Sequence, residues 1–382
     1  MAGPLSGFRI IELAGIGPGP YCGMMLADQG AEVIRIDRPG VNPMIAEVSG
    51  HGILFRNRRT LAVDLKKSEG VETVLRLCEG ADALFEGFRP GVTERLGLGP
   101  EVALARNPKL VYGRMTGWGQ EGPMARQAGH DINYIALTGA LHAMGRTADV
   151  PSPPLNLVGD FGGGGMMMAY GIVCALLEAQ KSGKGQVVDA AMVDGAASLM
   201  AMFYGLKNVG MFNGERGTHM LDTGAHFYDV YETADGKFLS VGAIEPQFYA
   251  ILKEKAQLPE ADFGVQMNTA QWPEQKLKIA AIIKQKTRAQ WTEIFDGTDA
   301  CVAPVLDLEE APQHPHMKAR KTFIDVGGST QPAPVPRFSR TPAAAPSPMV
   351  PMGQDSEAVL RDFGFSAADI EKLFAAGAVA NK

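Results

Sequence analysis

The sequence is poor in cysteine, and its four cysteines lie far apart without a Cys-x-x-Cys pair: Cys22, Cys78, Cys174 and Cys301. A disulfide framework and a cysteine-based zinc site are therefore not expected, and buried free thiols in a reducing compartment are the simpler interpretation. The spacing of the other potential ligands predicts no metal site either.

Long apolar runs and a charged leader are also missing. No apolar run reaches the ~18 residues of a membrane span, and the N-terminus lacks the basic-then-apolar pattern of a secretory signal. The net charge of −6 gives no support for nucleic-acid binding, although a basic cleft can lie within an acidic whole. We therefore expect a cytoplasmic protein with neither a nucleic-acid nor a membrane partner, and a peroxisomal or mitochondrial location stays an alternative.

What the sequence does contain is an alternation of strand and helix patterns. Strands are expected at 8–13, 31–37, 61–65, 83–86, 110–115 and 187–192, and helices at 21–29, 68–79 and 161–179. This alternation is typical of an α/β fold with a doubly wound, Rossmann-like domain.

The pattern changes near residue 225. A hairpin is expected at 226–242 around Ala234-Asp235-Gly236, and charged, helix-rich sequence follows it. Residues 331–351 are rich in proline and alanine, which indicates an extended connector, and two short helices close the chain. We predict a large domain over 1–224, a small α+β domain over 225–315, and a connector with C-terminal helices over 316–382.

A glycine-rich turn, Gly15-x-Gly17-x-Gly19-Pro20, follows the first predicted strand. Asp37 about twenty residues later invites a dinucleotide interpretation, but Pro20 stands where the third glycine of that fingerprint belongs. A generic tight turn is therefore the better interpretation. Basic residues from Arg38 to Arg95 could be a solvated face, yet a guanidinium beside the second strand also suits an adenosine phosphate.

The most informative stretch is Gly129-His130-Asp131-Ile132-Asn133-Tyr134, with Asn156 and Asp160 about one helix later. A lone histidine is more often structural, and Asp160 before four glycines could be an ordinary helix cap. An imidazole and a carboxylate near small-residue turns are also what a two-base proton-transfer enzyme needs. Backbone amides near Asp160–Gly163 are candidate donors to an enolate oxygen, and Asp131 and Asn156 are candidates to orient the two acid–base groups.

Glu245 is a further candidate with two interpretations. It precedes Pro246 in a Gly-Ala-Ile-Glu-Pro segment, where it could simply open a helix. It could also orient His130 and raise its basicity, if the small domain docks there. The residues alone leave both open.

Together these pieces resemble the family III CoA-transferase superfamily, and its racemase branch in particular. The resemblance covers nearly the whole chain and is carried by segments 12–20, 37–40, 89–100, 117–123, 129–134, 183–189, 242–249 and 297–306. His130 favours the racemase branch, because transferases usually have a non-basic residue there. The resemblance implies a Rossmann-like large domain built from both chain ends and an interlocked homodimer.

The resemblance also implies a substrate and its site. Arg38 would hold the adenosine phosphates with Arg95 nearby, and Ala62, Val63, Asp64 and Leu65 on an edge strand would line the adenine. Gly129 to Tyr134 would lie along the pantetheine and thioester, and Glu245 would approach His130 from the other chain. The implied activity is interconversion of (R)- and (S)-2-methylacyl-CoA thioesters by His130 and Asp160, without a metal or redox cofactor. The alternatives are a CoA-transferase with Asp160 as nucleophile and a non-enzymatic acyl-CoA carrier.

Overall fold

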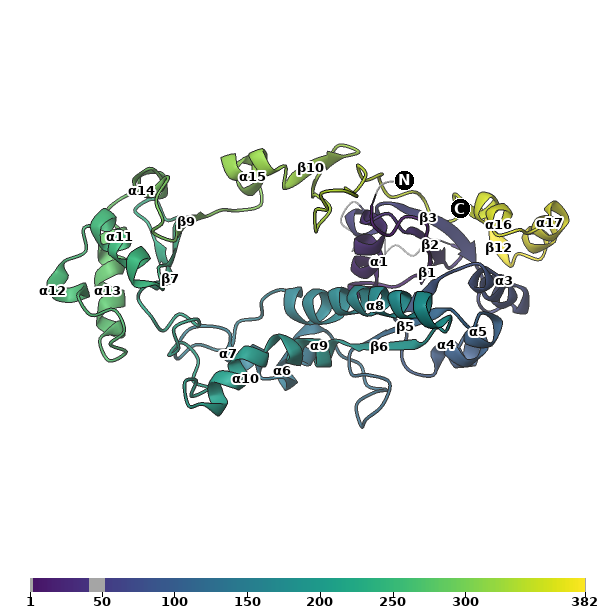
Figure 1. The fold of residues 1–382 in the computed structure, drawn as a ribbon, viewed down its shortest axis with the longest axis horizontal. Coiled ribbons are helices and arrows are strands. Elements are labelled where there is room, and N and C mark those ends of the chain that lie inside the picture. The colour runs from purple at the N-terminus through teal and green to yellow at the C-terminus, as the bar shows by residue number, and fades with distance from the viewer. Residues whose placement is uncertain (1–2, 41–51, 382) are drawn as a thin grey trace. The chain divides into compact units, whose positions relative to one another are not determined.

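The computed structural model describes residues 3–40 and 52–381, and the chain divides into two compact units (Figure 1). The larger unit comprises Met1–Thr138, Leu155–Met200 and Phe323–Lys382, and the smaller one comprises Gly139–Pro154 and Ala201–Thr322. The chain thus crosses between the units four times. These units are groups of residues in mutual contact, and they are not the same thing as independently folding domains. The predicted domain boundaries after residues 224 and 315 therefore stay predictions.

The larger unit is an alternation of strands and helices. Its elements are β1 (Arg9–Leu13), α1 (Pro18–Asp28), β2 (Glu32–Asp37), η1 (Ile53–Phe55), β3 (Arg58–Val63), α3 (Ser68–Glu79), β4 (Ala83–Glu86), α4 (Val92–Leu96), α5 (Pro100–Arg106), β5 (Val111–Thr116), α6 (Asp131–Leu137), η2 (Leu157–Met166), α8 (Met167–Ser182), β6 (Val187–Ala191), α9 (Met192–Leu199), β10 (Phe323–Val326), β11 (Ser329–Pro332), α16 (Ser356–Asp362), α17 (Ala367–Ala375) and β12 (Val379–Ala380).

A seven-stranded sheet organises this unit, in the order β12-β3-β2-β1-β4-β5-β6. All neighbours pair in parallel except β12, which pairs antiparallel with β3. The predicted α/β, Rossmann-like class is confirmed. The expectation that β3 is an edge strand is wrong, because Val379 and Ala380 pair with Val63 and Ala62. The strand β12 has only two residues, which is too short for a detectable alternation of apolar and polar residues in the sequence.

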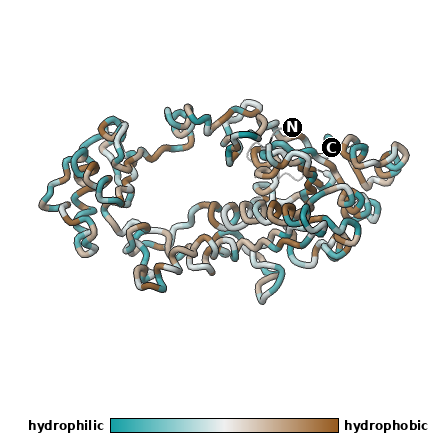
Figure 2. The backbone as a smooth tube through the Cα atoms, in the orientation of Figure 1, coloured by the Kyte–Doolittle hydropathy of each residue, from teal (hydrophilic) through white to brown (hydrophobic). Residues whose placement is uncertain are grey.

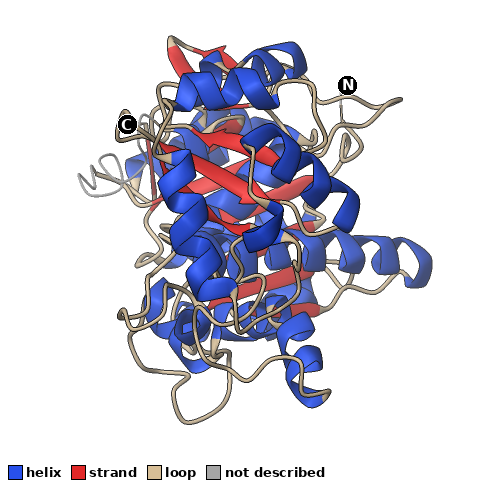
Figure 3. Cartoon of the chain, turned by 90° about the vertical axis from the view of Figure 1, so that its left-hand side faces the viewer, coloured by secondary structure: helices blue, strands red, loops and turns tan. Residues whose placement is uncertain are grey.

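Helices cover both faces of the sheet (Figure 3). Successive strand residues point to opposite faces, so Ile11 and Ile34 pack with α3, α16 and α17, whereas Ile10 and Val33 pack with α1 and α8. The near-continuous apolar strands reflect burial on both faces. Because α16, α17 and β12 complete one face and one edge, both ends of the chain build the large unit.

The stretch from Leu157 to Ser182 is continuously helical and hydrophobic (Figure 2). By length and composition it could cross a membrane, but 44% of its most apolar window is buried within the structure. Met168, Ile172 and Leu176 are core residues beside the sheet. That packing is typical of a core helix in a globular unit, and the expectation of no membrane partner stays a prediction.

The smaller unit is α+β. Its elements are α7 (Ala140–Ala143), α10 (Ala201–Asn208), β7 (Tyr228–Glu232), β8 (Phe238–Gly242), α11 (Pro246–Ala256), α12 (Glu260–Phe263), α13 (Trp272–Ile283), α14 (Arg288–Phe295), β9 (Val302–Val305), η3 (Ala311–Gln313) and α15 (Pro315–Arg320). The predicted hairpin forms as β7 and β8, and β9 adds an antiparallel third strand. Aromatic rings fill its core, among them Phe227, Tyr249 and Trp291.

His226 lies at the centre of this aromatic core and is fully buried. Its Nε2 is 2.8 Å from the Tyr249 hydroxyl, which in turn donates to the Phe263 carbonyl at 3.0 Å. The Nε2–H must therefore donate to Tyr249, and Nδ1 has no partner among the described residues. Burial lowers the pKa of His226 to about 4.

This buried imidazole makes stability depend on pH. An unfolded His226 gains a proton as the pH falls below ~6.5, whereas the folded one stays neutral down to a pKa of about 4. Acidification across this window should therefore cost up to about 3 kcal/mol, and raising the pH restores it. Urea unfolding of wild type and His226→Gln at several pH values checks this. The wild type should lose more stability on acidification than the variant, and parallel losses would contradict the assignment.

Candidate active site

A cavity of about 670 Å³ lies where the strands β1, β2 and β3 end. Its lining includes Leu13 and Ala14 at the end of β1, Ile36 to Gly40 at the end of β2, and Val63 to Lys66 at the end of β3. The carboxyl ends of parallel strands are where open α/β sheets bind their ligands. The cavity is therefore the candidate site for the nucleotide part of a ligand.

Four of the predicted CoA-binding residues line this cavity: Arg38, Val63, Asp64 and Leu65. Ala62 is buried within β3, and Arg95 is exposed on α4, so neither is part of the lining. Sequence reasoning missed Phe88, Leu96 and Met352, which also line it. Met352 comes from the C-terminal connector, and no local pattern indicates that this residue returns to the sheet.

A second group of predicted residues meets around Asp131, the first residue of α6. Asp131 is buried, and its Oδ2 accepts the backbone N–H of Asp160 at 2.7 Å. Gly159 makes this contact possible, because a Cβ there would lie 2.5 Å from the same carboxylate oxygen. One hydrogen bond thus joins the residue after His130 to the backbone of Asp160.

The Asp160 side chain is half-buried and points toward the glycine-rich turn. Its Oδ2 accepts a hydrogen bond from Asn156 at 3.1 Å, and a Cβ on Gly17 would lie 3.3 Å from that oxygen. Gly17 also has a φ of +67°, which L side chains rarely adopt. The absence of a side chain at Gly17, in the turn that resembles a dinucleotide motif, therefore leaves room for the Asp160 carboxylate.

The pKa of Asp160 is raised, mainly by burial. The hydrogen bond from Asn156 and the nearby His130 oppose the shift, while the negative charge of Asp131 adds to it. His130 is close enough to act electrostatically on Asp160. The Asp131–Asp160 hydrogen bond and the electrostatic effect of His130 on Asp160 place the two predicted acid–base residues in one part of the larger unit. The raised pKa favours the protonated form of the Asp160 carboxyl group.

His130 itself is exposed at the start of α6. Its backbone N–H donates to the Asn133 side-chain oxygen at 3.0 Å, and its carbonyl accepts the Asn133 N–H at 2.8 Å. These bonds hold the backbone while the imidazole faces solvent. Tyr134 also holds this segment. Its hydroxyl donates to the Gly129 carbonyl, and its ring makes an edge-to-face contact with Trp118, with the ring centroids 4.9 Å apart. Ile132 is exposed beside them.

Two expectations about this segment are wrong. Asp160 is not a helix cap; it lies in the first turn of η2, a π-helix whose cap residue is Asn156. The amides of Asp160 and Phe161 donate to Asp131 and to the Asn156 carbonyl, so these two are not free to bind an enolate oxygen. The run of four glycines does not reveal a π-helix, a rare form that is frequent at functional sites.

Glu245 lies in the smaller unit. It is exposed and is the N-cap residue of α11, with Pro246 in the first turn as predicted. Its charge helps to raise the pKa of Cys301 in the same unit, after burial as the main cause. Its approach to His130 of another chain stays a prediction. Among residues 3–40 and 52–381, no group of three or more potential ligand side chains could hold a metal ion.

Comparison with known proteins defines the class. The family described as CoA-transferase family III matches residues 5–356. A Brucella suis CaiB/BaiF family protein of known structure superposes with a TM-score of 0.81 at 24% identity, over 95% of this chain and all of that one. The chain therefore belongs to CoA-transferase family III, whose fold it shares.

Particular relatives are more similar in sequence. The chain is 50% identical to the α-methylacyl-CoA racemase of Mus musculus and 46% identical to that of Homo sapiens, each over 97% of this chain and 96% of the relative. It is 30% identical to the succinyl-CoA–D-citramalate CoA-transferase of Chloroflexus aurantiacus, over 97% and 96% of the two chains.

The contact at Gly159 can be tested directly. Gly159→Ala should push the Asp131 carboxylate away from the Asp160 amide and misplace the acid–base pair. Misplacement by about 1 Å costs on the order of 100-fold in rate. The measurement is turnover of a 2-methylacyl-CoA, with CoA binding as the control for the cavity at the strand ends. Full turnover in a correctly folded variant would show that this contact does not position the pair.

The hydrogen bond from Asn156 should also set a pKa. Because this bond lowers the pKa of Asp160, Asn156→Ala should raise that pKa further. The Asp160 carboxylate would then protonate at a higher pH than in the wild type. Carbon-13 NMR titration of the aspartate carboxyl signals, with Asp160→Asn for assignment, measures this in the free protein. An unchanged or lower pKa would contradict the role given to Asn156.

Proposed function

We propose that this chain is a racemase that interconverts (R)- and (S)-2-methylacyl-CoA thioesters. The observation that carries the proposal is the hydrogen bond from the Asp160 amide to the Asp131 carboxylate, which ties the residue after His130 to the first turn of η2. The two relatives named α-methylacyl-CoA racemase support it at 50% and 46% identity.

The proposed reaction moves one proton off a carbon and another onto it. In the (S) to (R) direction, the neutral His130 imidazole takes the α-proton, and the electron pair moves into the thioester as an enolate. The protonated Asp160 then gives its proton to the opposite face of that carbon. The reverse direction exchanges the roles. The raised pKa of Asp160 favours its protonated form, which is the form that this acid needs. No step is assigned to a metal or redox cofactor.

The rest of the substrate would extend to the cavity at the strand ends. Arg38 and Lys66 supply positive charge there, and Val63, Leu65 and Phe88 supply an apolar wall. That combination suits an adenine with its phosphates. We assign the adenosine part of CoA to this cavity.

Solvent exchange of the α-proton tests the activity. His130→Ala and Asp160→Ala should each slow epimerisation by roughly 100- to 10,000-fold, the usual contribution of a general acid or base. CoA binding, measured by calorimetry, should change little. The assay follows the chirality and α-deuterium of a 2-methylacyl-CoA in deuterated water. If either variant keeps near wild-type exchange, the assignment of that residue is wrong.

The transferase alternative predicts a different outcome. There Asp160 would attack the thioester carbonyl, expel the CoA thiolate and form an acyl-aspartyl anhydride. Hydroxylamine would trap that adduct, and α-deuterium would not enter the substrate, with or without an acceptor acid. Either result in the wild type would displace the racemase proposal.

We further propose that the protein is a homodimer with interlocked chains. Met166, Tyr170, Cys174 and Leu177 are all exposed, and their spacing places them along one face of the stretch that ends in α8. Tyr170 is 70% and Leu177 is 54% exposed. Such a stripe is unusual on a monomer surface, and a second copy of this chain is the occupant that the family resemblance implies.

A charge on this stripe should dissociate the dimer. Tyr170→Glu or Leu177→Glu would place a carboxylate in an apolar interface, where it has no partner. Sedimentation velocity should then show a monomer, while Glu101→Ala on the exposed face of α5 should stay dimeric. A monomeric wild type, or a glutamate variant that stays dimeric, would contradict the proposal.

A further inference from the structure

The segment between the two acid–base residues belongs to the smaller unit. His130 precedes α6 and Asp160 lies in η2, both in the larger unit, yet the intervening residues Gly139–Pro154 belong to the smaller one. The chain leaves the larger unit after Thr138 and returns at Leu155. Whatever holds this segment therefore acts on the ends of the two elements that carry the acid–base pair.

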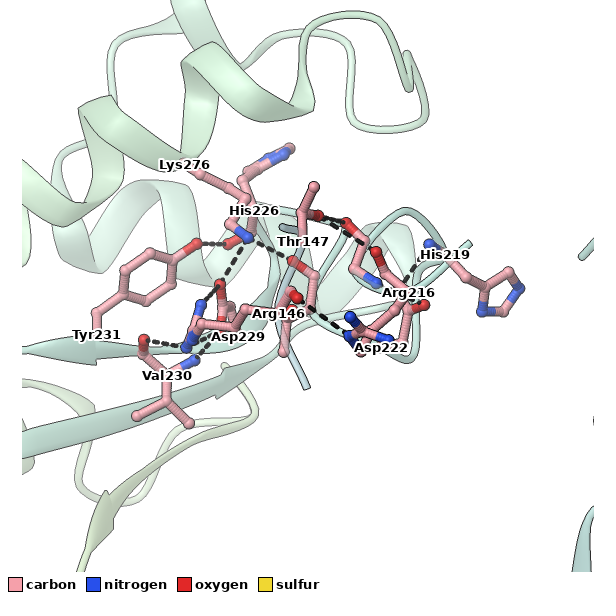
Figure 4. Close-up of polar contacts among 12 residues, drawn as sticks. Arg146, Thr147, Arg216, His219, Asp222, His226, Asp229, Val230, Tyr231 and Lys276 are labelled. Carbon is pink, nitrogen blue, oxygen red and sulfur yellow. Dashed lines mark hydrogen bonds and ion pairs between the residues drawn. The ribbon is translucent and has the colours of Figure 1, made fainter. Parts of the chain in front are cut away.

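A bidentate ion pair holds the middle of the segment (Figure 4). The Arg146 guanidinium donates to both carboxylate oxygens of Asp229 on β7, at 2.7 and 3.0 Å. The Asp229 side chain is only 1% exposed, and Lys276 of α13 lies 2.9 Å from the same carboxylate. A buried carboxylate with two cations is costly to leave unpaired, so Arg146 is held firmly.

A second arginine holds the same segment from the other side. Arg216 donates to the backbone carbonyls of His142, Arg146 and Asp149, and Thr147 donates back to the Gly217 carbonyl at 2.8 Å. The loop that carries Arg216 is in turn fixed by Asp222, which accepts the amides of Gly217 and His219 at 3.0 and 2.7 Å (Figure 4). Within the segment, Ala148 has a φ of +66°, a conformation that needs such support.

None of these groups is used in the proposed mechanism. We infer that Arg146, with Asp229 and Arg216, is a positioning residue that aligns His130 with Asp160 by fixing the chain between them. The inference rests on the proposed function for its catalytic readout. It relies only on the covalent connections of the segment after Thr138 and before Leu155.

The neighbouring ion pair provides a matched control. Arg146→Gln removes the tether to the segment, whereas Lys276→Gln removes the other cation from the same carboxylate and leaves the tether in place. Both changes disturb the charge balance of Asp229. Only Arg146→Gln should disturb the alignment of the acid–base pair. Arg146→Lys keeps the positive charge but cannot form the bidentate hydrogen bonds. It replaces Arg146→Gln in the experiment if the glutamine variant does not fold.

The first readout separates alignment from stability. Misaligned groups should give the His130 imidazolium time to exchange the abstracted proton for a solvent deuteron and to return that deuteron before Asp160 can deliver one, so α-deuterium would enter the substrate without inversion. In Arg146→Gln the ratio of retained to inverted deuterated product should rise about tenfold, and kcat should fall with KM little changed. Arg216→Gln should shift the ratio in the same direction. Lys276→Gln should keep the wild-type ratio.

The second readout does not require the proposed activity. Amide hydrogen exchange should quicken in α6 and η2 of Arg146→Gln, and it should keep its wild-type rate there in Lys276→Gln. A wild type that exchanges no α-proton would refute the proposed function. Amide exchange would still test whether the Arg146–Asp229 ion pair fixes α6 and η2. An unchanged deuterium ratio together with unchanged exchange in α6 and η2 would reduce the Arg146–Asp229 pair to a local stabilising contact and overturn the inference.

Discussion

The hydrogen bond from the Asp160 amide to the buried Asp131 carboxylate is the constraint on which the site depends. It ties the N-terminus of α6 to the first turn of η2, and each of these places carries one of the two acid–base groups. The bond needs Gly159 on one side and a buried Asp131 on the other. A mobile pair would lose most of the benefit of proximity, because inversion by two acid–base groups requires one group on each face of the same carbon.

The sheet supplies the second part of the account. Parallel strands end together, so residues that are far apart in sequence converge at one edge. Arg38 after β2, Val63 to Lys66 at the end of β3, and Phe88 after β4 meet there, and Met352 joins them from the connector. The cavity thus exists because both ends of the chain build one sheet unit.

Local patterns predicted much of the fold. The strands and helices of the first half, the hairpin and the closing helices form near their expected places, because apolar period and turn chemistry are local properties. Antiparallel pairing of β12 with β3 was not predictable, since two residues carry no period. The π-helix of η2 was not predictable either. An α-helix and a π-helix differ in which backbone groups are hydrogen-bonded, and this difference has no distinct amino-acid composition.

The site, like the fold, was predictable where local residue type and spacing indicate it and not where distant residues make the contact. His130, Asp131, Asn156 and Asp160 stood out by residue type and spacing. The structure joins Asp131 and Asn156 to Asp160 by hydrogen bonds, and His130 acts electrostatically on Asp160. The roles of Gly17 and Gly159 became apparent only from what a Cβ would touch. The Arg146–Asp229 tether could not be foreseen, because the two residues are 83 positions apart and neither lies in a motif.

The most direct test of the account is an experimental structure with a bound, non-exchanging analogue of a 2-methylacyl-CoA. The account predicts that the α-carbon lies between the His130 imidazole and the Asp160 carboxyl group, one on each face, with the adenosine in the cavity beside Arg38. An α-carbon that contacts only one of the two side chains, or an acyl group covalently attached to Asp160, would contradict it.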